Sequence, residues 1–446
     1  MPPNADTIAA VATAQGRGGV GVVRVSGCDV RTVANGILGR LPKARHATYA
    51  NFLDDQGDTL DQGIALYFPA PHSYTGEDVL ELQGHGGPAV LHMLLQRCVD
   101  LGARLAQPGE FTRRAFLNNK MDLAQAESVA DLIDADSSEA ARSALRSLCG
   151  EFSSAIRELV DALIHLRMLV EAMLDFPEEE VDSVDLQRRD VLLKDIRQKL
   201  QHTLDTARQG SLLREGAHIV IAGQPNVGKS SLLNKLSGEE AALVSDIPGT
   251  TRDVIRQVIQ LHGVPLHIID TAGLRESEDE VEKMGIARTH QTLHRADLIL
   301  LLLEASQGVT IQDSAILAGL PADIPRVLVF NKGDLLRGKV PVFPEHDRAI
   351  CISAKTGAGL EELRGMILEA VGWRAQESGA FMARERHLRA LQSAQNHLSQ
   401  AHEVLAGAEL FAEELRLAQR ALGEITGEFT SDDLLGEIFS RFCIGK

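Results

Sequence analysis

The stretch Gly223-Gln-Pro-Asn-Val-Gly-Lys-Ser230 fits the pattern G-x-x-x-x-G-K-S and directly follows an apolar run, His218-Ile-Val-Ile-Ala222. The apolar run predicts a buried strand, and Ser231-Leu-Leu-Asn-Lys-Leu236 predicts the start of a helix. In such a strand–loop–helix unit the glycines let backbone N–H groups wrap phosphate oxygens. Lys229 then neutralises the outer phosphates, and the Ser230 hydroxyl ligates Mg²⁺. The stretch therefore predicts a phosphate-binding loop.

Three further motifs each follow a strand-like apolar run. Asp270-Thr-Ala-Gly273 places a carboxylate on the metal side and a glycine where the γ-phosphate is sensed. Asn331-Lys-Gly-Asp334 ends in a carboxylate that accepts two hydrogen bonds from guanine and so selects it over adenine. Ser353-Ala-Lys355 forms a loop that backs the base. These motifs, in this order, predict a guanine nucleotide hydrolase of the Ras-like group.

A further motif of the predicted GTP site lies between the first helix and the second strand of this domain. Gly249-Thr-Thr-Arg-Asp253 contains Thr250 and Thr251, and a threonine there closes over Mg²⁺ and the γ-phosphate. Ras-type switches place a glutamine after D-T-A-G to orient the attacking water, but this chain has Leu274. Another group must orient the water. The candidates are Glu276, Glu278, Asp279, Glu280 and Glu282, and the alternative is an acidic, solvated helix start.

Asn226 lies inside the phosphate loop, where its side-chain oxygen could ligate a cation beside the phosphates. The alternative is an asparagine that merely favours the turn after Pro225. A second glycine-rich match, Gly16-Arg-Gly-Gly-Val-Gly21, fits G-x-G-x-x-G. A dinucleotide-binding loop must open a helix, whereas this stretch continues as a strand, so we reject that interpretation.

Length and patterning divide the 446 residues into roughly three domains. Short strands near residues 20–27 and 78–83 predict a small α/β or α+β domain at the N-terminus. Leucine-rich spacings of three and four from Leu145 to Met173 predict one long helix, and a further helical stretch closes at Gly210. Five predicted strands then alternate with helices, and helical stripes resume after Trp373; the strands are 218–222, 265–269, 298–303, 327–330 and 349–352. The fold class is α/β plus all-α, with a Ras-like P-loop G domain inserted into a helical domain; the boundaries are 1–118, 119–215, 216–372 and 373–446.

The composition limits the partners and the compartment. The net charge is −17, which disfavours nucleic-acid binding without a basic partner. No apolar run reaches the 18 or so residues of a membrane helix, and no secretory signal is visible. A reducing cytoplasm without membrane contact is the expectation, because no C-x-x-C occurs and the cysteines are scattered at Cys28, Cys98, Cys149, Cys351 and Cys443.

The flanks of the G domain resemble one family. Pro108-Gly-Glu-Phe-Thr-Arg-Arg-Ala-Phe-Leu-Asn-Asn-Lys-Met-Asp-Leu-Ala-Gln-Ala-Glu127 is similar to the N-terminal signature of the bacterial tRNA modification GTPases called MnmE or TrmE. Ser73-Tyr-Thr-Gly-Glu-Asp78, Gly84-His-Gly-Gly87 and the ending Phe442-Cys-Ile-Gly-Lys446 match it too. The resemblance covers essentially the whole chain. It implies an N-terminal tetrahydrofolate-binding and dimerisation domain, a helical domain and an inserted G domain.

The resemblance implies a role for each residue of the GTP site. Asn226 would bind K⁺ with its side chain, helped by backbone carbonyls of Ser245, Ile247 and Thr250, and Ser230 and Thr251 would hold Mg²⁺. Glu282 would orient the water, and we expect catalysis to depend on Glu282, Lys229 and Thr251. The residues expected to contact GTP are Asn226, Val227, Gly228, Lys229, Ser230, Ser231, Ser245, Asp246, Ile247, Pro248, Gly249, Thr250, Thr251, Asp270, Thr271, Ala272, Gly273, Asn331, Lys332, Asp334, Ser353, Ala354 and Lys355.

For 5-formyltetrahydrofolate the matching positions are Arg24, Glu81, Lys120 and Lys446. Without the resemblance, Arg24 would be an outward strand residue, Lys120 a polar turn residue and Lys446 a frayed end. Cys443 has no assigned role.

In the family, the enzyme is a homodimer that joins an FAD-binding partner of the MnmG (GidA) type in a heterotetramer or larger complex. The complex adds an aminomethyl or carboxymethylaminomethyl group to C5 of the tRNA wobble uridine. Two alternatives stay open: a ribosome-assembly or RNA-binding GTPase, and a signalling switch whose N-terminal domain is only a dimerisation scaffold.

Overall fold

The computed structural model describes residues 6–175, 183–238, 256–270, 296–336, 348–374, 379–403, 408–428 and 432–445. The chain divides into two compact units. The first comprises Met1–Asp134, Ser147–Ile196 and Ser393–Lys446. The second comprises Ala135–Arg146 and Arg197–Gln392. Among the described helices, none is both long and apolar enough to cross a bilayer.

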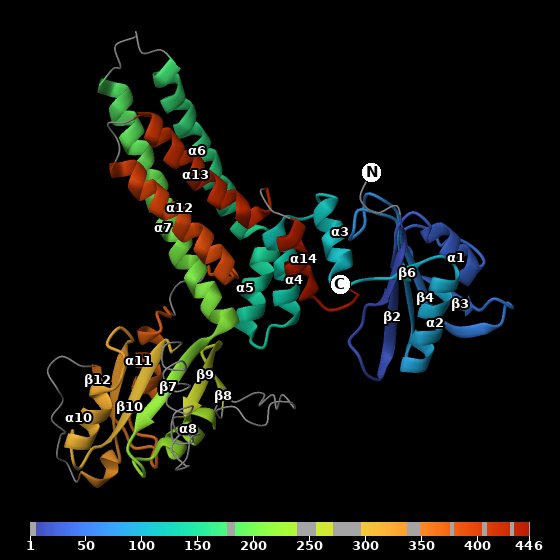
Figure 1. Ribbon diagram of the computed structural model, residues 1–446. Helices are drawn as coiled ribbons and strands as arrows, with labels where there is room; N and C mark the ends of the chain where they lie inside the picture. The colour runs from blue at the N-terminus through green and yellow to red at the C-terminus, as the bar shows by residue number, and fades with distance from the viewer. Residues whose placement is uncertain are drawn as a thin grey trace, which may run out of the picture. The chain divides into compact units, whose positions relative to one another are not determined.

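The N-terminal part of the first unit is built on a six-stranded sheet with strand order β3-β4-β5-β2-β1-β6 (Figure 1). Neighbouring strands are antiparallel, except that β1 and β6 run parallel. Strands expected near residues 20–27 and 78–83 are confirmed, and the rejected glycine-rich motif runs into β2 as a strand. The bounds are β1 Ile8–Val11, β2 Gly18–Ser26, β3 Thr48–Leu53, β4 Thr59–Phe68, β5 Val79–Gly86 and β6 Arg104–Leu105.

Helices cover the two faces of this sheet differently. On one face, α1 (Val30–Leu38) and α2 (Pro88–Asp100) bury the apolar residues that alternate along β2 and β5. On the other face, Phe111 of α3 (Glu110–Leu117) packs on Ile8 and Ala10 of β1, with Tyr74 against this cluster. Further out, α3 packs beside α4 (Leu123–Ile133) and α14 (Asp432–Ser440), so the end of the chain returns to the N-terminal part (Figure 1).

The predicted single helix from Leu145 to Met173 is wrong. The chain forms α5 (Ser138–Leu148) and then α6 (Glu151–Asp175), separated at Gly150, whose φ of 92° is the left-handed conformation that ends helices. The apolar spacing continues across the break, which is why periodicity alone could not show it. The stripes predicted near the C-terminus are confirmed as α12 (Glu385–Glu403) and α13 (Ala408–Thr426), and α13 packs against α6.

Gly210 does not close a helix, contrary to the sequence prediction. Helix α7 runs from Ser183 to Glu215 and passes through Gly210. A Cβ atom at Gly210 would lie 1.8 Å from the carbonyl oxygen of Phe381. The glycine therefore serves close packing of another backbone against the helix.

The second unit contains a sheet with strand order β12-β11-β10-β7-β9-β8 (Figure 1). The five predicted strands are confirmed and run parallel, and the edge strand β8 is antiparallel to β9. Alternate strand residues bury two faces, one against α8 and α11 and the other against α10. The bounds are β7 Ala217–Gly223, α8 Lys229–Ser237, β8 Arg256–Leu261, β9 Val264–Asp270, β10 Leu298–Glu304, α10 Ile311–Ala318, β11 Arg326–Asn331, β12 Arg348–Cys351 and α11 Leu360–Ala370.

This α/β layer architecture lies in the chain between α7 and α12, so the predicted fold class is confirmed. Because five strands run parallel, their carboxyl ends share one edge of the sheet. The phosphate loop follows β7, Asp270 ends β9, Asn331 ends β11 and Ser353 follows β12. Ligands of open α/β sheets bind at this edge.

Candidate nucleotide-binding site

The phosphate loop adopts a backbone that requires its glycines. Gly223 has φ 145° and Gly228, at the N-terminus of α8, has φ 99°. A Cβ atom at Gly223 would lie 2.4 Å from the carbonyl oxygen of Leu302. Asn226 between them is also left-handed, with φ 63°, which asparagine tolerates better than most residues. The loop therefore needs residues that tolerate a positive φ at these three positions.

Lys229 closes the loop on itself. Its side chain is only 8% exposed although it carries a charge. The ammonium Nζ donates to the carbonyl oxygens of Gly223, at 2.9 Å, and Gln224, at 2.8 Å. These bonds hold the ammonium group inside the loop, where it would pair with a bound phosphate group.

Asn331 connects three motifs. Its Nδ2 donates to the carbonyl oxygen of Val227 at 2.8 Å, and its Oδ1 accepts from the N–H of Ala354 at 2.9 Å. A Cβ atom on Gly228 would lie 2.3 Å from Asn331 Nδ2, so this bridge also needs the glycine. Asn331 therefore braces the phosphate loop against the loop after β12, a role that the sequence analysis did not foresee.

The side chains expected to read the base are also held in place. Ser353 Oγ donates to Asp334 Oδ1 at 2.7 Å and accepts from the N–H of Thr356 at 3.2 Å. Lys332 has φ 63° and pairs through Nζ with Glu304 Oε2 at 2.7 Å. The bond from Lys332, followed by that from Ser306, holds the pKa of Glu304 below its ordinary value. Glu304 ends β10 and was missed because no motif marks it.

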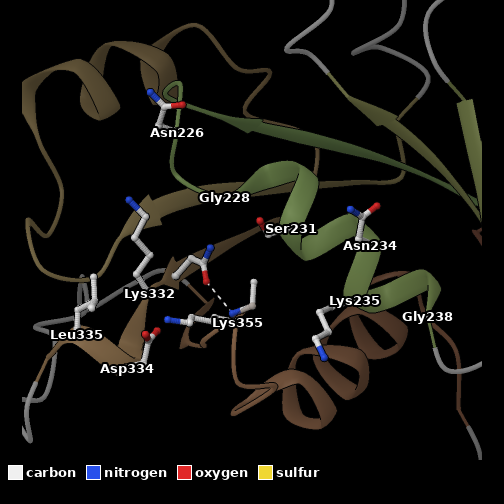
Figure 2. Close-up of a pocket in the computed structure, with 12 residues that line it drawn as sticks. Asn226, Gly228, Ser231, Asn234, Lys235, Gly238, Lys332, Asp334, Leu335 and Lys355 are labelled. Carbon is white, nitrogen blue, oxygen red and sulfur yellow. Dashed lines mark hydrogen bonds between the residues drawn. The ribbon is translucent and has the colours of Figure 1, made fainter.

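A pocket of about 830 Å³ joins these loops (Figure 2). That volume suits a ligand of nucleotide size. Eight of its lining residues were predicted to contact GTP: Asn226, Gly228, Ser231, Asn331, Lys332, Asp334, Ala354 and Lys355.

Four lining residues were not predicted from the sequence: Asn234, Lys235, Gly238 and Leu335. The first three share one side of α8 with Ser231, at the i, i+3, i+4, i+7 spacing that marks a helix face, and this signal could have found them.

Two predicted metal ligands can be placed. Ser230 is exposed in the first turn of α8, and Asn226 is exposed on the loop and lines the pocket. Both offer neutral oxygen atoms of the kind that Mg²⁺ and K⁺ accept, so the residues fit such ions. The side chain of Asp270 and the predicted residues Ser245, Asp246, Ile247, Pro248, Gly249, Thr250, Thr251, Thr271, Ala272, Gly273, Glu282 and Lys446 lie outside the described part of the structure.

The N-terminal domain brings Arg24 and Glu81 together. They are direct neighbours across β2 and β5, and Arg24 Nη2 lies 2.9 Å from Glu81 Oε1. The Arg24 guanidinium carbon also lies over the ring of Tyr74, 5.4 Å from its centroid, and over the ring of Phe111, 5.7 Å from its centroid. Its Nη1 donates to the carbonyl oxygen of Gly445 at 3.4 Å. The C-terminal tail is therefore part of this cluster, as are two aromatic residues that the sequence did not reveal.

Lys120 is placed differently. Its Nζ donates to the carbonyl oxygen of Pro71 at 3.0 Å on the exposed side of the loop that carries Tyr74. Lys120 thus bonds to the loop rather than to Arg24 or Glu81.

A buried charge network supports that loop. Arg114 of α3 is fully buried and pairs with Asp6, Glu77 and Glu110 at 2.9–3.1 Å. Burial opposes ionisation of Glu110, but its bonds from Arg104, the Gln107 N–H and Arg114 hold its pKa below the ordinary value. Glu77 in turn accepts from Ser26 Oγ at 2.8 Å. The network fixes the loop of Tyr74 against the sheet that carries Arg24.

A phosphate loop, a braced Asn-Lys-x-Asp loop and a pocket between them at the carboxyl edge of a parallel sheet define a P-loop guanine nucleotide enzyme. Comparison with protein families gives the particular family. The family model "GTP-binding protein TrmE N-terminus" matches residues 7–120, and "MnmE helical domain" matches residues 123–443. The chain belongs to the MnmE (TrmE) family, a family of GTP hydrolases.

Full-length relatives agree. The chain is 61% identical over 446 residues to the tRNA modification GTPase MnmE of Thiobacillus denitrificans, covering 100% of this chain and 99% of the relative. It is 60% identical over 448 residues to the protein of that name from Nitrosospira multiformis, covering 99% of each. A crystal structure of Era from Aquifex aeolicus with GDP and AlF₄⁻ aligns over 41% of this chain and 66% of that one, at 29% identity and a TM-score of 0.30.

Proposed function

We propose that this enzyme uses GTP hydrolysis to drive modification of C5 of the tRNA wobble uridine in the cytoplasm. An aminomethyl or carboxymethylaminomethyl group is added, in a complex with an FAD-binding partner of the MnmG (GidA) type. The observation that carries this proposal is the identity of about 60% along the whole chain to proteins named tRNA modification GTPase MnmE. The match includes the N-terminal and helical parts, which a general GTPase does not need.

Within the G domain, the chain's own residues bind and orient the nucleotide. The loop from Gly223 to Gly228 and the Lys229 ammonium receive the phosphates, and the Asp334 carboxylate accepts the guanine hydrogen bonds. Ser230 and Thr251 would hold Mg²⁺, and Asn226 with the carbonyls of Ser245, Ile247 and Thr250 would hold K⁺. These cations offset negative charge that develops on the phosphates. Leu274 cannot orient water, so Glu282 takes that role in the proposal.

The N-terminal cluster is proposed to bind 5-formyltetrahydrofolate or a related one-carbon donor. Arg24 contacts two aromatic rings and pairs with the Glu81 carboxylate, so its remaining N–H groups are oriented before a ligand arrives. Glu81, Lys120 and Lys446 complete the expected contacts. Glutamate and pterin groups of a folate suit a guanidinium beside aromatic rings. Equilibrium dialysis with 5-formyltetrahydrofolate, against an Arg24→Met variant, tests this part separately.

The net charge of −17 supports a division of labour. Tight tRNA binding draws on lysine and arginine contacts to phosphates. In the proposal the chain acts as a homodimer, and the FAD-binding partner makes most contacts with tRNA. The heterotetramer or larger complex then holds folate, flavin and tRNA together.

Reconstitution tests the function as a whole. The purified chain, the MnmG-type protein of the same organism, tRNA, FAD with a hydride donor to reduce it, a folate donor, ammonium or glycine as the source of the amino nitrogen, GTP, Mg²⁺ and K⁺ are incubated. The wobble nucleosides are measured by mass spectrometry. We expect C5-modified uridine only when both proteins and GTP are present. Unmodified tRNA from an active GTPase, with immature ribosomal subunits accumulating when the chain is depleted, would instead support a ribosome-assembly GTPase.

A further inference from the structure

Gln224 is the first variable residue of the phosphate loop, and its side chain leaves the loop. Its Nε2 donates to Thr310 Oγ1 at 2.8 Å and to Asp313 Oδ1 at 2.8 Å. Thr310 is the residue that caps α10, and Asp313 is the third residue of that helix. The bonds join positions 86 and 89 residues apart in the chain.

Asp313 makes this bond costly to lose. It is 2% exposed, so its carboxylate depends on protein donors. Its Oδ2 accepts from the Thr310 N–H at 3.0 Å and from Thr310 Oγ1 at 2.7 Å. Gln224 supplies the bond to the other oxygen. Removing the glutamine amide would leave a buried carboxylate oxygen short of a donor.

The phosphate loop is therefore pinned on both sides of its bend. At one side Gln224 is tied to α10 by its side chain and to Lys229 by its carbonyl oxygen. At the other side Asn331 holds the carbonyl oxygen of Val227. Only Pro225 and Asn226 lie between the pins, and Asn226 is left-handed and faces the pocket.

We propose that Gln224 is a positioning residue of the GTP site. It fixes the phosphate loop by tying it to the capped end of α10, and it links the position of α10 to nucleotide affinity. This inference needs only guanine nucleotide binding. It does not depend on K⁺, folate or the partner protein.

The test measures GDP affinity and dissociation with a fluorescent GDP analogue on the full-length protein. Gln224→Leu removes the amide, and Gln224→Glu places a second carboxylate against Asp313. We expect each variant to bind GDP about tenfold more weakly or worse, mostly through faster dissociation. Gln312→Leu is the matched control, because Gln312 is exposed on the same helix, and it should leave affinity unchanged.

The decisive test is a double variant that exchanges the amide of position 224 and the carboxylate of position 313. In Gln224→Glu combined with Asp313→Asn, the new amide donates to the new carboxylate and still accepts from the Thr310 N–H. We expect affinity to return to within about threefold of the wild type, which a general loss of packing would not allow. Thermal unfolding identifies any variant that fails to fold. GDP affinity within twofold of wild type in folded Gln224→Leu, or a folded double variant weaker than both single variants, would overturn the proposal.

Discussion

The nucleotide loops and the N-terminal cluster hold their functional side chains by different bonds. In the nucleotide loops, Lys229 bonds to backbone carbonyls of its own loop, Asn331 to a backbone carbonyl of the phosphate loop, and Ser353 to the carboxylate of Asp334. In the N-terminal cluster, Arg24 and Arg114 are held mainly by carboxylates and rings. The first arrangement depends on backbone shape and the second on charge. Changes of shape should therefore disable nucleotide binding, while changes of charge or pH should affect the N-terminal part.

Gly228→Ala should have the largest effect. The added methyl group would lie 2.3 Å from Asn331 Nδ2, and φ is 99° there. Both the loop and the Asn331 bridge must shift, so we expect GDP affinity to fall at least about 100-fold. Gly365→Ala is the control, because that helical position has open space around it. Normal GDP binding by Gly228→Ala would show that loop shape is not limiting.

Asp334→Asn should have the second-largest effect. The amide cannot accept both hydrogen bonds from guanine, whereas xanthine offers it an acceptor. We expect guanine nucleotide affinity to fall roughly 100-fold and xanthine nucleotide affinity to rise. Competition of GDP and XDP for the same site measures both. Unchanged GDP affinity would assign base reading to another residue.

Arg114→Met tests the inference that the N-terminal cluster depends on charge. It leaves Glu77 and Glu110 without a fully buried cation, so we expect the N-terminal domain to lose about 3–5 kcal/mol of unfolding free energy. Hydrogen exchange of peptides within residues 6–120 measures this change. GDP binding should stay normal. Arg31→Met, at an exposed pair with Asp78, is the control and should change little. Equal protection in wild type and Arg114→Met would contradict the role of the network.

Acid should give the smallest of these effects. The pKa values of Asp6 and Glu110 lie below their ordinary values because bonds from Arg104 and Arg114 outweigh the opposing effect of burial. The folded state thus favours the charged forms, and their stabilising contribution is complete above the ordinary carboxyl pKa of about 4. It is lost as the pH falls through the lowered values.

Urea unfolding at several pH values down to 3 tests this effect. Circular dichroism reports the whole chain, and fluorescence of the single Trp373 reports the second unit. We expect part of the circular dichroism transition, the part from the N-terminal domain, to move to lower urea concentration as the pH falls. The Trp373 fluorescence transition should move only at a lower pH. The shift of the circular dichroism transition should be smaller in Arg114→Met. An equal response to acid in the wild type and in Arg114→Met would show that the charge network does not cause the acid sensitivity.

The sequence predicted the residues of the nucleotide site better than it predicted the contacts that hold them in place. Gly223, Gly228 and Lys229 lie within one short loop, so their spacing was enough to predict it. The bond from Gln224 to Asp313 and that from Arg24 to Gly445 span 89 and 421 residues, and no local pattern predicts such contacts.

The two glycines of the helical part make the same point about helix ends. Gly150 breaks a helix that was predicted to continue, and Gly210 continues one that was predicted to end. Gly150 adopts a left-handed φ of 92°, whereas Gly210 stays helical with the backbone of Phe381 packed beside it, and the sequence states neither outcome.

GTP turnover in K⁺ and in Na⁺ at matched ionic strength tests the proposed mechanism most directly. We expect turnover roughly tenfold or more faster in K⁺, because in the proposed function a cation held at Asn226 supplies the charge that an arginine supplies elsewhere. Asn226→Ala should abolish the difference while still binding GDP. Equal rates in the two salts would contradict the account and assign activation to another protein.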